Sequence, residues 1–157
     1  MIKLKSLVEV KSGIWNWYKE QLPDWPDYVI KDLIYMPLKN HEDMADKQKH
    51  INILKQRWEG IVWKLEKIPI TLDIFDDFSK SLLIKRMGGN PQEIPRDSER
   101  HQIQKDLIKS RGVTKEPIIV IKARHQKYEL LEGWHRTIQN LQAFPDGYVG
   151  NVWVGYI

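Results

Sequence analysis

A short run of branched apolar residues constrains the fold of this chain more than any other feature. Pro117 opens the run Ile118-Ile119-Val120-Ile121, and charged and polar residues follow it. Four consecutive branched side chains cannot alternate between a core and water, so they favour a strand that is buried on both faces. The C-terminal half of the chain is therefore expected to form a small mixed sheet, with this run at its centre and helices packed against it.

The stretch after a polar turn has the pattern of a strand, a glycine and a helix. Residues 128–132 alternate in the manner of a strand, and Gly133 allows the backbone to turn. A helix that starts after such a glycine points its first N–H groups outward, where they can bind an anion. His135 and Arg136 fall in the first helical turn, where positive side chains oppose the helix dipole. A bound phosphate would explain why cations are placed there.

A second expected helix start carries the same two residue types. Asp97 is a natural N-cap, Arg100 and His101 follow it in the first turn, and Arg96 comes just before it. Two helix starts that each pair a histidine with an arginine suggest two walls of one anion pocket. The alternative is that these cations lie on the surface and extend toward solvent.

Composition limits the function classes. The 157 residues suffice for one sizeable core, and 41% hydrophobic with 29% charged residues is ordinary for a soluble globular protein. The chain has no cysteine, which excludes disulfides, thiolate metal sites and thiol catalysis. No apolar run resembles a signal peptide or reaches transmembrane length, so a cytoplasmic location without membrane contact is expected. The net charge of +4 permits nucleic-acid binding without requiring it.

Residues 1–60 are expected to form a helical, tryptophan-rich extension or cap, and residues 61–157 a separate domain. One helix is predicted to begin at Pro26 and to end at Pro37, and a second to run over residues 41–59. The tryptophans Trp15, Trp17 and Trp25 could offer a surface on which bases stack. Aromatic residues at such spacing more often form a core or an interface, and we favour that interpretation.

The remaining elements of the second domain follow from local patterns. Residues 61–65 are predicted to form a strand, and residues 68–70 an edge strand or the start of another. Asp76 or Asp77 is expected to cap a helix whose apolar residues include Phe78, Leu82, Leu83 and Met87. Another helix is expected after Asp97, ending at Gly112, and a last strand at residues 152–156.

The order of these parts resembles the ParB/sulfiredoxin superfamily. In that superfamily a helix leads through a glycine to a strand that begins Pro-Ile-Ile-Val, and a second strand ends in a Gly-x-x-Arg box at a helix start. Here the matching residues are Pro117–Val120 and Gly133-Trp134-His135-Arg136. Asn90-Pro91 and Pro95-Arg96 are similar to the Asn-Pro…Pro-Arg segment of ParB-like domains, and residues 68–70 to their opening strand. The resemblance covers roughly the C-terminal half and implies an α+β fold of the ParB/sulfiredoxin type.

The branches of the superfamily differ in the box. Trp134 stands where sulfiredoxin has its cysteine, so that repair chemistry is excluded. Partition ParB proteins have a Gly-Glu-Arg-Arg box followed by a helix-turn-helix, whereas only about twenty residues follow the box here. The free serine kinases have Asp-Gly-His-His-Arg, and Glu132-Gly133-Trp134-His135-Arg136 is closer to that.

The resemblance implies a nucleotide-binding, ATP-type phosphotransferase or ATPase. Its expected catalytic residues are Glu132, His135 and Arg136. The phosphates or nucleotide would contact Gly133, Trp134, His135, Arg136, Thr137, Arg96, Arg100 and His101. Mg²⁺ would accompany the nucleotide, with Glu132 as its nearest carboxylate and Asp76 and Asp77 behind it, although a helix cap is the more common role of such aspartates.

Two other functions remain open. The chain could be a ParB-like nuclease or another nucleic-acid-processing protein that binds DNA. It could also be a non-catalytic binding module that has kept the pocket and lost the chemistry.

Overall fold

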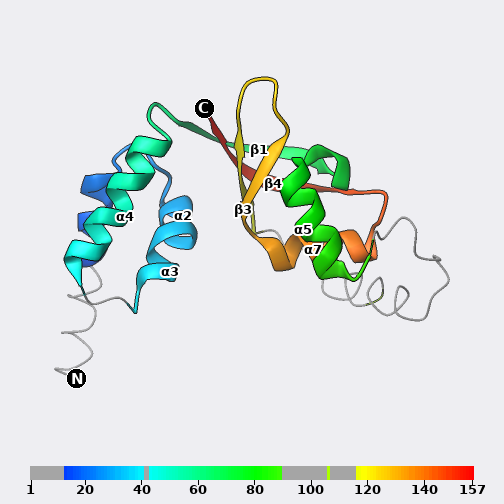
Figure 1. Ribbon diagram of the computed structural model, residues 1–157, viewed down its shortest axis with the longest axis horizontal. Helices are drawn as coiled ribbons and strands as arrows, with labels where there is room; N and C mark the ends of the chain where they lie inside the picture. Colours follow the sequence, from blue (N-terminus) through cyan, green and yellow to red (C-terminus); the bar gives the residue numbers. More distant parts are fainter. Residues whose placement is uncertain (1–12, 41–42, 90–105, 107–115) are drawn as a thin grey trace. The chain divides into compact units, whose positions relative to one another are not determined.

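The chain divides into two compact units in the computed structural model, residues 1–61 and residues 62–157 (Figure 1). The structure describes residues 13–40, 43–89, 106 and 116–157. The described part of the first unit contains helices and no strand, and the second unit combines a four-stranded sheet with helices. The protein therefore belongs to the α+β class. The helix expected between Asp97 and Gly112 lies outside the described residues, as do Arg96, Arg100 and His101.

The helices of the first unit follow one another closely. Residues 13–21 are helical, and α2 (Asp27–Ile30) continues through the π-helical turn η1 (Lys31–Tyr35) into α3 (Met36–Leu38). After the gap, α4 spans Met44–Arg57, and Asp43 caps it by accepting a hydrogen bond from the Ala45 N–H at 2.8 Å. The helical path ends at Leu38, one residue beyond the expected end at Pro37. Pro37 falls in the short segment α3, directly after the π-helical turn η1.

Tryptophans build the core of the first unit. Trp25 is only 7% exposed, and its ring lies 6.1 Å from that of Trp58 with a tilt of 37°. Trp15 packs edge-on against Tyr35. These contacts are those of aromatic side chains that fill a core, and the burial of Trp25 leaves little of its ring for an external base.

One buried group of this core lacks a hydrogen-bond partner. Tyr18 is fully buried between its ring contacts with Trp17 and Tyr35, and its hydroxyl makes no hydrogen bond in the part of the chain described. Burial, together with Tyr35, raises the pKa of Tyr18 above its ordinary value. Among the described residues, the hydroxyl thus finds no hydrogen bond to replace the hydration that it loses on folding.

We therefore expect Tyr18→Phe to stabilise the first unit. Removing an unsatisfied buried hydroxyl relieves a desolvation cost of about 1–3 kcal/mol. Calorimetric melting of the full chain should show a higher melting temperature, whereas Tyr35→Phe, at a half-buried position, should change it little. A lower melting temperature for Tyr18→Phe would mean that the hydroxyl has a partner.

The sheet of the second unit is mixed. Its strands are β1 (Val62–Ile70), β2 (Ile118–Lys122), β3 (Tyr128–Glu132) and β4 (Tyr148–Tyr156), in the order β1-β4-β2-β3. Strand β4 runs antiparallel to β1 and parallel to β2, and β3 runs antiparallel to β2. Residues Ile118–Ile121 are each at most 3% exposed. The prediction of a small mixed sheet with this run inside it is confirmed.

Strand β1 is longer than the sequence indicated. It runs without interruption from Val62 through Pro69 to Ile70 and joins two segments that were expected to be separate. Within the sheet β1 pairs only with β4, so it is an edge strand. Pro69 is accepted there because an edge strand does not need every N–H for a ladder.

Helices α5 (Asp77–Met87) and α7 (Trp134–Ala143) share a core with one face of the sheet. A short 3₁₀ turn, η2 (Leu72–Ile74), lies in the connection between β1 and α5. The buried residues of this core come from β1, η2, α5, β2, β3, α7 and β4 and from the residue after η2; they are Ile70, Leu72, Phe75, Leu83, Met87, Ile118, Val120, Leu130, Leu141, Val152 and Val154.

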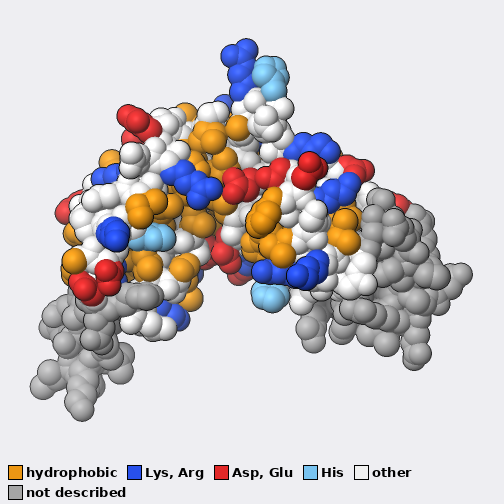
Figure 2. All heavy atoms as spheres, viewed as in Figure 1, with side chains coloured by type: hydrophobic (Ala, Val, Ile, Leu, Met, Phe, Trp, Pro, Cys, Tyr) orange, Lys and Arg blue, Asp and Glu red, His pale blue; other side chains and the backbone are white. Residues whose placement is uncertain are grey.

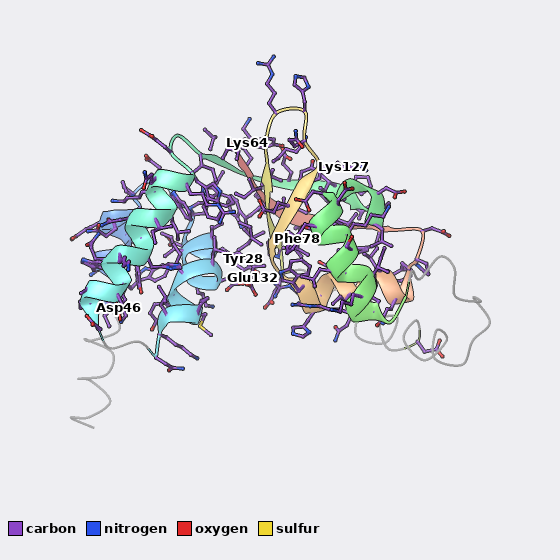
Figure 3. The ribbon with its side chains drawn as sticks, in the orientation of Figure 1. Tyr28, Asp46, Lys64, Phe78, Lys127 and Glu132 are labelled. Carbon is purple, nitrogen blue, oxygen red and sulfur yellow. The ribbon has the colours of Figure 1, made fainter. Side chains whose placement is uncertain are left out.

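Helix α5 turns a serine, not the expected phenylalanine, toward the sheet. Phe78 is 73% exposed, whereas Ser79 is fully buried (Figure 3). The Ser79 Oγ accepts a hydrogen bond from the Leu130 N–H at 3.0 Å, and the Asp76 N–H donates to the Tyr128 carbonyl at 2.8 Å. Residues 75–79 thereby satisfy backbone groups on the outer edge of β3, which requires Ser79 to face inward and leaves Phe78 in solvent.

The hairpin between β2 and β3 reaches beyond the neighbouring strands (Figure 1). Lysine, arginine and histidine side chains occupy its tip (Figure 2). In the described part of the chain, no helix is long and apolar enough to span a membrane.

Candidate functional site

Gly133 fixes the start of α7 against the start of β2. Its φ of 94° lies in the left-handed region, and it occupies the N-cap position of α7. A Cβ added to Gly133 would lie 2.6 Å from Ile118 Cγ2 and 3.2 Å from Ile118 Cα. Both the backbone conformation and the close contact therefore require glycine. The first turn of α7 is brought in this way to the end of the sheet where β2 begins.

Thr137 supports this start from within. Its side chain is fully buried, its Oγ1 donates to the Gly133 carbonyl at 2.8 Å, and its N–H donates to the same carbonyl at 3.0 Å. The hydroxyl proton thus serves the local backbone, so Thr137 shapes the helix start and does not point at a ligand.

Arg136 is tied to the segment that enters β2. Its Nη1 lies 2.8 Å from Glu116 Oε2, and its Nη2 donates to the Pro117 carbonyl at 3.2 Å. The Arg136 side chain is 20% exposed and that of Glu116 is 69% exposed, so the ion pair lies at the surface on the carboxylate side. The guanidinium is therefore held in one orientation beside the first turn of α7.

Trp134 and His135 are neighbours in the first turn of α7, but Trp134 packs against the protein and His135 faces solvent. The Trp134 ring is half-buried against the core, and its Nε1 donates to the Leu131 carbonyl at 3.3 Å. The Arg86 guanidinium carbon lies 5.0 Å from the centre of the Trp134 ring, within cation–π range. His135 is exposed. Cationic side chains from α5 and α7 thus flank the N-terminus of α7.

Tyr148, at the start of β4, lies near Arg136, Thr137 and Asn140 of α7. Its hydroxyl oxygen is buried, and no hydrogen bond to it meets ordinary distance and angle limits in the described ranges. Burial raises the pKa of Tyr148, and the nearby Asn140 and Thr137 side chains and the Arg136 charge offset part of that rise. Polar groups from α7 and β4 therefore lie close together near Arg136.

The carboxylates expected to bind a metal are not brought together. Glu132 ends β3, next to Gly133. Asp76 caps α5, accepting from the Ser79 N–H at 2.8 Å, and its own N–H bonds to Tyr128 at the opposite end of β3. At about 3.3 Å per residue, the two ends of this five-residue strand lie roughly 13 Å apart, and Figure 3 shows Glu132 and Lys127 at its two ends. Among the described residues, no three histidine, aspartate or glutamate side chains form a group suited to a metal ion.

The sequence did not single out three residues of this site. Arg86 comes from α5, Glu116 precedes β2 and Tyr148 begins β4. No local pattern marks any of them, because each reaches Trp134 or Arg136 only through the folding of the sheet. The expected contributions of Arg96, Arg100 and His101 lie outside the described residues.

A second polar cluster lies at the other end of the sheet. The Tyr156 hydroxyl donates to Glu66 Oε2 at 2.6 Å, and the Lys64 ammonium lies 5.7 Å from the centre of the Tyr156 ring. Burial raises the pKa of Tyr156 to about 12, with the hydrogen bond to Glu66 and the Glu66 charge adding to the effect.

No protein-family model, curated protein or solved structure matches the chain. The second unit has an α+β fold, with the strand order β1-β4-β2-β3 and the helices α5 and α7.

Gly133→Ala should destabilise the second unit. Placing alanine in the left-handed region costs roughly 1–2 kcal/mol, and the close approach to Ile118 adds to that cost. Gly89→Ala is a control in the same unit, because Gly89 has a φ of 137° but nothing within 4 Å of an added Cβ. Urea unfolding of the full chain should show the larger loss for Gly133→Ala. Equal losses would show that the contact with Ile118 contributes nothing.

The Glu66–Tyr156 pair should make stability depend on alkaline pH. In the unfolded chain Tyr156 ionises near the ordinary tyrosine pKa of 10.0, and in the folded chain its pKa is about 12. The stability that protonated Tyr156 contributes to the folded chain is therefore complete below pH 10 and is lost as the pH rises through 12. Unfolding free energies measured over this range should fall less steeply for Tyr156→Phe than for the native chain. Identical slopes would contradict the assignment.

Proposed function

We propose that this chain is a nucleotide-binding protein of the ParB/sulfiredoxin-like fold that acts as an ATP-type phosphotransferase or ATPase. The observation that carries the proposal is the cationic start of α7. His135 and Arg136 belong to the first turn of α7, whose first N–H groups have no intrahelical partner, and Arg86 lies against the Trp134 ring of the same turn. Such a start favours a negative group both by its N–H donors and by the helix dipole.

The ion pair of Arg136 is compatible with a phosphate ligand. Glu116 is largely exposed, and an exposed ion pair contributes only about 0–1 kcal/mol. A hydrogen bond from a guanidinium to a charged group contributes roughly 1.5–3 kcal/mol when it is well made. A phosphate can therefore replace the Glu116 carboxylate, while the Pro117 carbonyl continues to orient the guanidinium.

Trp134 supports a nucleotide in preference to a bare phosphate. Its ring is half-buried directly at the helix start and already has one face beneath a guanidinium. An aromatic ring beside a phosphate site can contact a base or ribose, and here the base would replace the Arg86 guanidinium over the Trp134 ring.

The proposed chemistry depends on positioning and on neutralising charge. In phosphoryl transfer the protein holds the phosphates in line and stabilises the charge that develops on them. Arg136 supplies positive charge, His135 can donate a hydrogen bond, and Glu132 is the carboxylate nearest to them in the chain. Mg²⁺ is commonly held by one or two carboxylates together with substrate phosphates, so Glu132 alone satisfies the minimum requirement. Asp76 and Asp77 lie at the wrong end of β3 to assist.

The decisive experiment compares Arg136→Ala with Glu116→Gln. Calorimetric titration with ATP and Mg²⁺, and with CTP and GTP in parallel, should give about ten- to a hundredfold weaker binding for Arg136→Ala, the equivalent of one lost charge-assisted contact. Glu116→Gln keeps the arginine and removes the competing carboxylate, so its nucleotide affinity should be equal or higher. Lys80→Gln, on the Tyr128 side of α5, controls for net charge.

The same variants separate ligand binding from a structural role. If Arg136→Ala lowers the melting temperature while nucleotide affinity stays intact, the phosphate assignment is wrong. Binding without release or transfer of phosphate would identify a non-catalytic module and contradict the enzymatic part of the proposal.

A further inference from the structure

The β2–β3 hairpin concentrates positive charge. From Pro117 to Tyr128 the chain contains no aspartate or glutamate, and its cationic residues fall in the last part of that segment, at Lys122, Arg124 and Lys127 with His125 between them. Arg124, His125 and Lys127 are exposed. Figure 2 shows these residue types together at the projecting tip.

The tip is a hydrogen-bonded turn. The Gln126 N–H donates to the Ala123 carbonyl at 3.0 Å, and His125 has a φ of 62°, in the left-handed region that non-glycine residues seldom adopt. The Lys122 ammonium donates to the Gln126 carbonyl and, at 3.4 Å, to the Ala123 carbonyl. A strained residue persists only where surrounding contacts fix it. Lys122 therefore holds the turn together, while Arg124 and His125 are presented at its end.

Two tyrosines lie beside the base of the hairpin on one face of the sheet. The strand register places Lys122 opposite Tyr128 of β3 and opposite Tyr156 of β4. The Lys122 ammonium lies 5.8 Å from the Tyr128 ring centre, and the Lys64 ammonium lies 5.7 Å from that of Tyr156. Both tyrosines are partly buried against the core, and a lysine ammonium covers each ring. Glu66 fixes the Tyr156 hydroxyl at the ring edge.

We propose that this hairpin end of the sheet binds single-stranded nucleic acid. Arg124, Lys127 and Lys64 contact phosphates, and Tyr128 and Tyr156 stack on bases. Interleaved cationic and aromatic side chains are the combination that recognises single strands without strong sequence preference.

The energies favour exchange of Lys64 for a base, whereas Lys122 stays bound to the carbonyls of the turn. An exposed cation–π contact is worth about 0.5–1 kcal/mol, whereas a base stacked on an aromatic side chain is worth roughly 1–3 kcal/mol. A base can therefore displace Lys64 from the Tyr156 ring and leave the ammonium to meet a phosphate.

Other polyanions fit this surface less well. A duplex hides its base faces, so the tyrosines would gain nothing from it. Residues 122–127 contain no large apolar side chain, whereas a membrane-binding element buries apolar residues among the lipid chains. The surface is also separate from the start of α7, because the two lie at opposite ends of β2 and β3.

The first test removes charge. Binding of the full chain to a short fluorescent oligothymidine should be measured by anisotropy over a range of salt. The variant Lys64→Gln/Arg124→Gln/Lys127→Gln should bind at least tenfold more weakly, and the slope of log affinity against log salt should fall by about 2, from roughly 0.7 for each lost phosphate contact. The variant Lys31→Gln/Lys39→Gln/Lys49→Gln removes equal charge from exposed positions of the first unit and should bind as the native chain does.

The second test detects stacking. The native chain should prefer oligothymidine to an abasic strand of equal length. That preference should be lost in Tyr156→Leu and kept in Tyr156→Phe, with the melting temperature of each variant confirming its fold. Should Tyr156→Leu fail to fold, the comparison of oligothymidine with the abasic strand on the native chain alone decides the point.

Several results would overturn the proposal. These are the absence of oligonucleotide binding at low salt, equal losses for the two charge variants, equal affinity for abasic strands, or binding to phosphatidylserine vesicles that is as strong as binding to oligothymidine. ATP affinity of the hairpin charge variant should be unchanged, so failure here is independent of the function proposed for α7.

Discussion

The burial of β2 on both faces is the constraint on which the second unit depends. A strand of branched residues from Ile118 to Ile121 cannot serve as an edge, so a strand must lie on each side of it and other residues must cover its faces. Strand β4 supplies the parallel neighbour and β3 the antiparallel one. Helix α7 then starts close to Ile118, at a distance that only glycine permits. The direction in which α7 points its first N–H groups follows from this one contact.

Much of this architecture could be predicted from local chemistry. The buried run, the cap at Asp76 and the strand–glycine–helix order around Gly133 each depend on residues that are close in sequence. The continuity of β1 could not be predicted, because Pro69 signals a break unless the strand is known to lie at an edge. The burial of Ser79 could not be predicted either, because its hydrogen-bond partner is the N–H of Leu130, which is distant in sequence.

In the candidate site, too, local features could be predicted from the sequence and contacts between distant residues could not. The sequence places His135 and Arg136 at a helix start, but it does not reveal that Arg136 meets Glu116 or that Arg86 covers Trp134. Among the carboxylates, Glu132 is the nearest metal candidate in the sequence, and Asp76 and Asp77 stand behind it with a helix cap as their more common role. The cap at Asp76 is present, and the direction of β3 separates Asp76 from Glu132. Proximity of charge across a sheet depends on register, which local patterns in one sequence do not reveal.

The closed outer edge of β3 has a consequence for how copies of this chain meet. Ser79 and Asp76 engage the Leu130 N–H and the Tyr128 carbonyl, so a strand from another molecule finds those groups occupied. At the other edge of the sheet, Pro69 offers no N–H, and Lys64 and Lys67 are exposed along β1. Proline and lysine on an edge strand oppose pairing with a foreign strand. In the described part of the chain, hydrogen bonding on one margin of the sheet and proline and charge on the other thus hinder the addition of a strand from another copy.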